Sequence, residues 1–196
     1  MYSNIMRKKG KLIIFSAPSG SGKSTIIAEV MKDKKLRMEF SISATTRPPR
    51  GNEKNGREYY FLTLDQFKQR VQAGDFVEYQ EVYPGRFYGT LKSEIERINS
   101  QGRNVVLDLD VLGGMNVKKM YGEHAKSIFI KAPSVTVLRE RLERRGTDTP
   151  EDVEKRIGKA EFELGFVNQF DACIVNDDLP TAIREARGII DDFINN

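Results

Sequence analysis

The sequence has little of the chemistry that several classes of enzyme need. It contains one cysteine, Cys173, and one histidine, His124. A single cysteine excludes an internal disulfide and favours a reducing compartment, so we expect a cytoplasmic protein. Cys173 lies in a short apolar run, so we expect its thiol to be inert and buried in the core. One histidine leaves almost no material for a zinc site or a histidine-based catalytic triad.

Long hydrophobic runs are also missing. No stretch is long enough to span a membrane, and the basic N-terminus is followed by too few apolar residues for a signal peptide. Hydrophobic residues make up 39% and charged residues 31% of the 196 residues, and the net charge is +4. That modest excess gives weak support for nucleic-acid binding, and anionic nucleotide substrates would explain it equally well. We therefore expect one globular protein that binds neither nucleic acid nor membrane.

The most informative feature that is present is a glycine-rich turn between an apolar run and a helix-forming run. This context is typical of a P-loop, in which small residues let backbone N–H groups surround a phosphate and the following helix adds its positive dipole end. Lys23 brings a positive charge to the transferred phosphate, and the Ser24 hydroxyl can bind Mg²⁺. The predicted ATP-binding residues of this turn are Ala17, Pro18, Ser19, Gly20, Ser21, Gly22, Lys23, Ser24 and Thr25.

One position departs from the usual P-loop pattern GxxxxGK[ST], in which the first glycine is replaced here by Ala17. Alanine is the smallest possible change, so we expect it to be tolerated. A chance glycine-rich turn with an exposed lysine is the alternative, and the flanking strand and helix argue against it.

Strand-like and helix-like segments alternate along most of the chain. Short apolar runs predict strands at 11–17, 104–109, 127–131 and 172–175. Helices are predicted at 24–34, 91–101, 111–121, 134–145, 150–166 and 179–194. This order predicts an α/β fold whose core is a parallel sheet with helices on both faces.

Residues 37–90 break this alternation. They hold short strand-like runs at 40–43, 58–62, 76–82 and 86–89 around one short helix at 64–73. We expect an inserted small α+β lobe here, with residues 1–36 and 91–196 forming the core. The polar loop 47–57 holds two prolines and two glycines, and we expect the glycines at 51, 56, 85 and 89 to supply backbone freedom.

Two further groups of residues suit phosphate chemistry. Asp108 ends an apolar strand, where a Mg²⁺ partner of a P-loop is expected, and Asp110 follows it. The alternative is that these acids merely begin the helix at 111, and the residues alone support the two roles of Asp110 equally. Arg47 and Arg50 flank two prolines, and guanidinium groups grip phosphate bidentately, although a solvated basic loop is also compatible.

With these segments together, the chain resembles the guanylate kinases. The resembling blocks are APSGSGKST, SISATTRPPRGNEKNGREYYF, FVEYQEVYPGRFYGT, VVLDLDVLGG, RLERRGTDTPEDVEKRI and IVNDD, in family order from about residue 11 to 194. The TTRxPRxxExxGxxY arrangement is the specific part. The resemblance implies a P-loop kinase that transfers the γ-phosphoryl group of ATP to GMP with Mg²⁺, with a GMP-binding lobe and a mobile helical lid at about 140–160.

The resemblance also implies roles for individual residues. The GMP phosphate would be held by Arg47, Arg50, Tyr59 and Tyr88. Guanine would be read by Ser43, Glu78, Thr90 and Asp110. Lid arginines that reach the ATP phosphates would be Arg141, Arg145 and Arg156, with Asn176 near the adenine. Catalysis would rest on Lys23, Arg47 and the three lid arginines, and the metal would be held by Ser24 and Asp108.

Some of these assignments have simpler alternatives. Arg141 and Arg145 share one helix face in a segment of alternating charge, which by itself indicates a solvated, salt-bridged surface. Glu78 could be an ordinary surface acid, and the tyrosines could simply pack. One extra residue near Pro84-Gly85 distinguishes the turn between Glu78 and Tyr88 from the family pattern.

Two other functions stay open at this point. The chain could be a binding module of the kind found in scaffold proteins, although Lys23, Ser24 and the lid arginines argue against a lost nucleotide site. It could also be a kinase for another monophosphate, which Glu78 and Ser43 disfavour. We expect GMP and ATP as substrates, with dGMP as a further candidate, in a monomer or a homodimer.

Overall fold

A computed structural model describes residues 10–146 and 148–196. The N-terminal residues 1–9 lie outside this described part. The expectation that the chain has no signal peptide falls on these residues. The chain divides into two compact units: unit 1 comprises residues 1–11 and 39–106, and unit 2 comprises residues 12–38 and 107–196. Within the described part, no helix combines the length and the apolar character needed to cross a membrane.

A five-stranded sheet has the strand order β2-β7-β1-β8-β9. Its strands are β1 (Leu12–Ser16), β2 (Met38–Phe40), β7 (Asn104–Asp108), β8 (Ala125–Lys131) and β9 (Ala172–Val175). The helices of unit 2 are α1 (Lys23–Val30), α4 (Val111–Tyr121), α5 (Val135–Arg145), α6 (Pro150–Leu164) and α7 (Leu179–Asn195), with short 3₁₀ turns at Lys34–Leu36, Gly122–His124 and Val167–Gln169.

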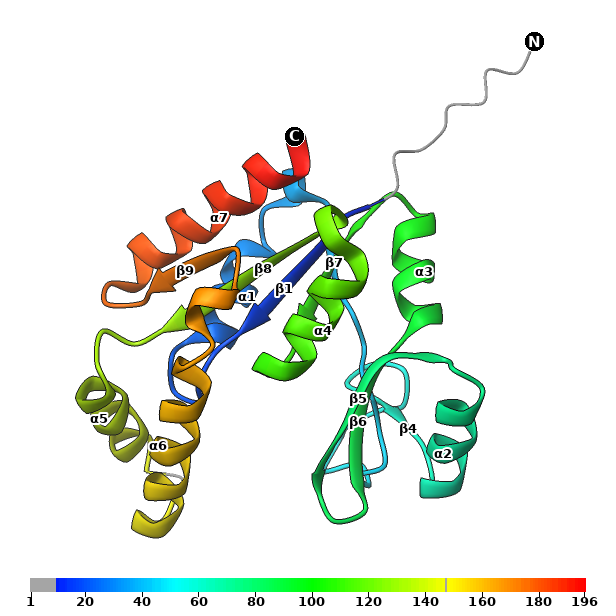
Figure 1. The fold of residues 1–196 in the computed structure, drawn as a ribbon, viewed down its shortest axis with the longest axis horizontal. Coiled ribbons are helices and arrows are strands. Elements are labelled where there is room, and N and C mark those ends of the chain that lie inside the picture. Colours follow the sequence, from blue (N-terminus) through cyan, green and yellow to red (C-terminus); the bar gives the residue numbers. More distant parts are fainter. Residues whose placement is uncertain (1–9, 147) are drawn as a thin grey trace. The chain divides into compact units, whose positions relative to one another are not determined.

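The central strands are parallel and buried on both faces. All five residues of β1 are buried, and β1 pairs in parallel with β8, which pairs in parallel with β9. Helix α4 lies across one face of β1 and β8, and α1 lies on the opposite face (Figure 1). A Cβ at Gly114 of α4 would come 2.8 Å from Ser16 Oγ, so glycine permits the close approach of this helix. The predicted α/β fold with a parallel core sheet is confirmed.

The prediction for Cys173 is wrong, because its side chain is exposed. Strand β9 is the edge of the sheet, and in it only Ile174 is buried. An apolar run predicts a strand well, but it does not tell a central strand from an edge strand whose alternate residues face solvent.

Helices α5 and α6 form an antiparallel pair with a small core of their own. Its buried residues are Ala132, Leu138, Leu142, Val153, Ile157 and Ala160. Each helix begins at a capping hydroxyl: Ser134 Oγ accepts from the N–H of Val137, and Thr149 Oγ1 accepts from that of Asp152. The guanidinium of Arg139 also bridges from α5 to the Glu154 carboxylate on α6. These contacts hold the segment of the predicted lid in a defined form.

Unit 1 holds a four-stranded sheet with the order β4-β3-β6-β5. Its elements are β3 (Ala44–Thr45), β4 (Tyr60–Phe61), α2 (Leu64–Gln72), β5 (Phe76–Tyr83), β6 (Arg86–Leu91) and α3 (Lys92–Ser100). Helix α2 starts with a capping box between Thr63 and Gln66, and its Phe67 stacks on Phe76 at 4.4 Å between ring centroids. The β5–β6 hairpin and α2 are seen together in Figure 1.

Two expectations for this unit need correction. The run 40–43 is not a continuous strand, because β2 ends at Phe40 and β3 begins at Ala44. Gly89 does not supply flexibility. Its φ is not positive, and a Cβ there would lie 2.8 Å from Phe76, so it provides space for packing. The turn at Pro84-Gly85 joins β5 to β6, and the pairing shifts register between Glu81 and Tyr83, which is how a hairpin takes up an extra residue.

Candidate functional site

The P-loop is a tight turn between β1 and α1. Gly20 and Gly22 have φ values of 88° and 89°, a conformation that favours glycine. A Cβ at Gly22 would lie 2.2 Å from Asn176 Nδ2, so a side chain there would collide with the asparagine. Helix α1 begins at Lys23, which directs its first N–H groups and its positive dipole end toward this turn.

Ala17 fits the turn without strain. Among the described residues other than glycine, only Arg37 has a positive φ, so position 17 does not need glycine's freedom. The turn is braced from β9 by Asn176, whose Nδ2 donates to Ser21 O at 2.8 Å. Asn176 is 5% exposed and supports the loop backbone, a contact that the sequence did not predict for it.

A cavity of about 770 Å³ opens beside the P-loop in unit 2. It brings together residues that are far apart in sequence and that were predicted separately. Its lining includes Ala17, Pro18, Ser19, Gly20, Gly22, Lys23, Ser24, Thr25, Asp108, Asp110, Arg141, Arg145 and Arg156. Every predicted catalytic residue of unit 2 therefore lines one cavity.

Asp108 and Asp110 both line this cavity. The Lys23 ammonium contacts Asp108 Oδ1 in an ion pair. Asp110 caps α4, because its Oδ1 accepts the Gly113 N–H at 2.8 Å. The helix-start role predicted for Asp110 is confirmed, and one of its carboxylate oxygens is occupied by that role.

The lid arginines reach the P-loop and its support. Arg156 on α6 donates to Ser19 Oγ at 2.9 Å and to Asp148 at 3.0 Å. Arg141 on α5 donates to Asn176 O at 2.9 Å. Arg145 lies one turn further along α5, so both arginines of this helix face the cavity, as their spacing predicts.

Sequence reasoning missed two charged residues of this cavity, Lys159 and Glu163. Both are on α6, three and seven residues after Arg156, so they share a helix face with it, and this spacing was the available signal. The Glu163 side chain is nearly buried, and burial raises the pKa of its carboxyl above the ordinary value, although Lys159 and Lys23 oppose the shift. The cavity thus holds a buried acid among its cations.

In unit 1, two predicted guanine-reading residues touch. Glu78 on β5 and Thr90 on β6 are paired in the hairpin, and Thr90 Oγ1 donates to Glu78 Oε1 at 2.7 Å. Thr90 is 1% exposed. A buried hydroxyl therefore orients the carboxylate, which is not the arrangement of an ordinary surface acid.

The predicted phosphate-binding residues of unit 1 also cluster. The rings of Tyr59 and Tyr88 meet edge to face with centroids 5.9 Å apart, and Arg47 Cζ lies 5.3 Å from the Tyr59 centroid. Glu53, which sequence reasoning missed, receives two hydrogen bonds of 2.9 Å from the Arg47 guanidinium. Hydrogen bonding to Glu53, and then to Tyr88, raises the pKa of Arg47 despite its burial, so the guanidinium is a fixed cation.

The two remaining predicted residues of this unit are Arg50, which is exposed, and Ser43, which is half-buried. The Arg50 backbone N–H donates to Glu53 Oε2 at 2.7 Å. Ser43 immediately precedes β3, and its carbonyl accepts the Tyr60 N–H at 2.9 Å. Seven of the eight predicted GMP-binding residues thus belong to unit 1, and the eighth, Asp110, belongs to unit 2.

Comparison with known proteins agrees with these observations. A family model described as Guanylate kinase matches residues 9–193. The chain is 58% identical over 186 residues to the guanylate kinase of Bacteroides fragilis, which covers 95% of this chain and 91% of that protein. It is 53% identical over 184 residues to the guanylate kinase of Porphyromonas gingivalis, with coverage of 94% and 98%.

A solved structure agrees as well. The crystal structure of guanylate kinase from Anaplasma phagocytophilum superposes with a TM-score of 0.74 at 29% identity, covering 96% of this chain and 88% of that one. A P-loop, a parallel sheet and matches over nearly the whole length define a P-loop kinase fold. The chain belongs to the guanylate kinase family.

Proposed function

We propose that this protein transfers the γ-phosphoryl group of ATP to GMP and releases ADP and GDP. The observation that carries the proposal is the cavity of unit 2, where Lys23, Asp108 and the three lid arginines surround the P-loop. Phosphoryl transfer needs little covalent chemistry from the protein, because positioning and neutralisation of charge lower the barrier. The backbone N–H groups of the P-loop, Lys23 and the three lid arginines suit that task.

In this proposal, the P-loop and Lys23 hold the β- and γ-phosphates of ATP. Arg141, Arg145 and Arg156 neutralise charge that develops on the transferred group. Asn176 acts by bracing the P-loop and lies beside the adenine. None of these residues forms a covalent intermediate, so catalysis depends on aligning the two phosphates and excluding water.

Mg²⁺ is the proposed metal, held by the Ser24 hydroxyl and the Asp108 carboxylate. The donor set fits, since both residues line the cavity and offer the oxygen ligands that Mg²⁺ prefers. The described residues contain no group of three or more acidic, histidine or cysteine side chains that could hold a metal. That suits an ion that keeps several waters and binds mainly through substrate phosphates. When bound, it would neutralise phosphate charge.

GMP is the proposed acceptor, bound by the lobe of residues 37–90, while residues 1–36 and 91–196 bind ATP. Guanine presents N1–H and N2–H₂ donors along one edge, and the Glu78 carboxylate can accept both. Adenine presents an acceptor at the same place, so the half-buried Glu78 carboxylate would face another acceptor there. Such a mismatch can reduce the use of the wrong substrate by roughly 10⁴-fold.

The remaining contacts complete the GMP site. Ser43, Thr90 and Asp110 assist in reading the base, and Arg47, Arg50, Tyr59 and Tyr88 hold its phosphate. Asp110 would use Oδ2 for this purpose, because Oδ1 caps α4. We further propose a cytoplasmic monomer or homodimer that also accepts dGMP.

The substitution Glu78→Gln tests how the base is read. The amide keeps the shape but places a donor against guanine's donors, so we expect the KM for GMP to rise about 10- to 100-fold, the range for a lost hydrogen bond to a charged group. The affinity for ATP should stay within about twofold of wild type, because Glu78 is proposed to contact GMP and not ATP. A coupled assay of ADP formation measures both.

Glu81→Gln is the matched control, because Glu81 is an exposed residue of the same strand. Its carboxylate accepts the Gly85 N–H, and the amide oxygen of glutamine can do the same. Equal changes in both KM values for Glu78→Gln, or no change, would mean that Glu78 does not read guanine.

A further inference from the structure

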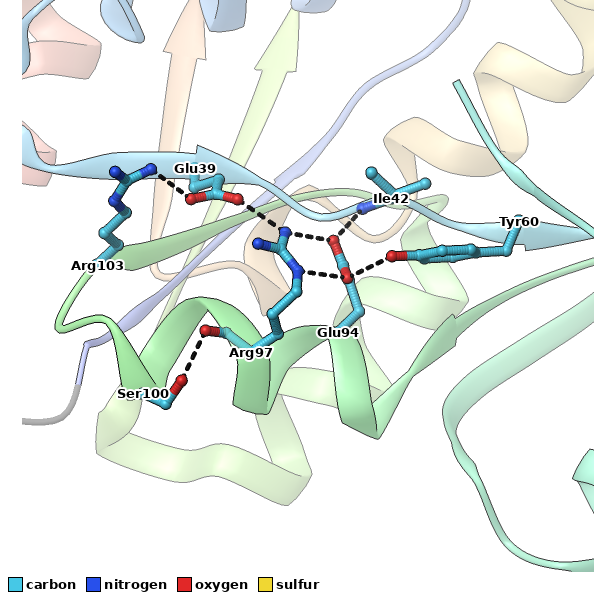
Figure 2. A network of polar contacts seen from close by, with 7 residues as sticks. All are labelled: Glu39, Ile42, Tyr60, Glu94, Arg97, Ser100 and Arg103. Carbon is cyan, nitrogen blue, oxygen red and sulfur yellow. Dashed lines mark hydrogen bonds and ion pairs between the residues drawn. The ribbon is translucent and has the colours of Figure 1, made fainter. Parts of the chain in front are cut away.

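Glu94 on α3 is a buried carboxylate to which no role has yet been given. It is 2% exposed. Figure 2 shows that its two oxygens receive hydrogen bonds from three different parts of unit 1. The donors are the backbone N–H of Ile42 at 3.2 Å, the Tyr60 hydroxyl at 2.9 Å and the Arg97 guanidinium at 3.0 and 2.8 Å.

Two of these donors are direct neighbours of proposed GMP-binding residues. Ile42 precedes Ser43, and Tyr60 follows Tyr59. The two segments are also joined to each other, because Tyr60 N–H donates to Ser43 O at 2.9 Å. One carboxylate therefore fixes both the entry to β3 and the start of β4.

The alternation of a strand explains how such a contact can act on the other face. Successive side chains of an extended segment point in opposite directions. Tyr60 points toward Glu94, so Tyr59 points away from it, to the face where it meets Tyr88 and Arg47. Holding the Tyr60 hydroxyl thus sets the orientation of Tyr59 without touching it.

The charge of Glu94 is balanced by a chain of ion pairs. Arg97 bridges Glu94 to Glu39 on β2 with a bond of 2.7 Å, and Arg103 contacts the other oxygen of Glu39 at 2.6 Å (Figure 2). Burial by itself raises the pKa of Glu94, but the hydrogen bonds from Arg97, Ile42 and Tyr60 outweigh it and lower the pKa. The carboxyl stays an anion at neutral pH, and an anion is a strong acceptor of the hydrogen bonds from the Ile42 N–H and the Tyr60 hydroxyl.

We propose that Glu94 is a positioning residue of the GMP site, which acts through Ile42 and Tyr60 to place Ser43 and Tyr59. The inference rests on the proposed function, since it assumes that Ser43 and Tyr59 contact GMP. Its consequence is selective. Weakening this network should impair the binding of GMP and leave the P-loop, which belongs to unit 2, with its usual affinity for ATP.

The test compares Glu94→Gln and Tyr60→Phe with wild type. The first keeps the shape but loses the charge, and the second removes one hydroxyl. We expect the KM for GMP to rise about tenfold in Glu94→Gln, which weakens every hydrogen bond to the carboxylate, and a few-fold in Tyr60→Phe, which removes one of them. The KM for ATP and the kcat at saturating GMP should change by less than about twofold. Glu96→Gln, the same substitution at an exposed position of the same helix, should change neither KM.

A purely structural role would give a different pattern. Thermal unfolding would shift while both KM values stayed at the wild-type level, and that result would overturn the proposal. If Glu94→Gln does not fold, Tyr60→Phe decides by the same criterion, because it removes only one oxygen.

Two further variants, Ser43→Ala and Tyr59→Phe, are measured in parallel. They separate the positioning role of Glu94 from the proposal that Ser43 and Tyr59 contact GMP. If these two raise the KM for GMP while Glu94→Gln and Tyr60→Phe do not, the positioning role is wrong and the GMP site stands. If none of the four variants affects GMP, both the GMP site and the positioning role are wrong.

Discussion

At the scale of single residues, the P-loop part of the candidate site follows from chemistry that is visible in the sequence, and the lid arginines follow from the resemblance to the guanylate kinases. Lys23, Arg141, Arg145 and Arg156 come from three separate segments, yet all line one cavity. Glu53 and Glu163 were given no role, although Glu53 is the glutamate of the TTRxPRxxExxGxxY arrangement and Glu163 shares a helix face with Arg156. An acid in a polar loop or on a charged helix looks like any solvated residue until the fold shows what it touches.

Lys23→Ala should nearly abolish turnover. Its ammonium is the cation placed at the first turn of α1, and loss of such a charge costs on the order of 10³-fold or more in kcat. The fold should survive, since a partly exposed ion pair such as Lys23–Asp108 contributes about 1 kcal/mol or less to stability. A coupled assay measures the loss of turnover, and thermal unfolding of the same preparation checks that the fold survives.

Lys32→Ala is the control, because Lys32 is exposed, lies just beyond the end of α1 and pairs with nearby Glu29. It should match wild type in both measurements. Near-normal turnover of Lys23→Ala would contradict the assignment of the P-loop.

At the scale of secondary-structure elements, segments with a clear local pattern were predicted more accurately than strands of two residues. Helix α4 was predicted at its observed bounds, 111–121, and β9 at 172–175. The strand predicted at 40–43 was wrong, because two-residue strands such as β3 and β4 are defined by their partners and not by a local pattern. The burial of Cys173 was mispredicted for a similar reason, since an edge position depends on the order of strands in the sheet.

Asp110 combines an element-level role with a proposed role in the site, and two substitutions separate them. Asn caps helices as well as Asp, so Asp110→Asn should keep stability within about 0.5 kcal/mol, whereas Asp110→Ala should lose about 1 kcal/mol. If the carboxylate also reads guanine, both variants raise the KM for GMP. Urea unfolding and the coupled assay provide the two measurements. A normal KM in Asp110→Asn would leave this residue as a helix cap alone.

At the scale of the whole molecule, the proposed mechanism requires motion. GMP is assigned to residues 37–90 and ATP to the P-loop, and in-line transfer needs their phosphates close together with water excluded. We expect the lobe and the lid to close when both nucleotides bind. The positive φ values of Gly51, Gly56 and Gly85 mark positions where the backbone of the lobe has glycine's freedom.

The exposed Cys173 offers a way to measure this closure. A dye on Cys173 and a second on Gln69→Cys, an exposed position of α2, report the distance between core and lobe. Energy transfer should rise when GMP and a non-hydrolysable ATP analogue are added together. A pair within unit 2, such as Cys173 with Asp191→Cys, should report a constant distance. An unchanged signal from the first pair at saturation would contradict closure but not the kinase activity.

The central claim is tested most directly by offering the purified protein ATP, Mg²⁺ and one monophosphate at a time: GMP, AMP, UMP or TMP. The account predicts rapid formation of ADP with GMP and a rate lower by orders of magnitude with the other three, because we propose that the Glu78 carboxylate, which Thr90 orients, accepts the N1–H and N2–H₂ donors of guanine. Comparable rates with AMP or a pyrimidine, or no turnover with GMP, would contradict it.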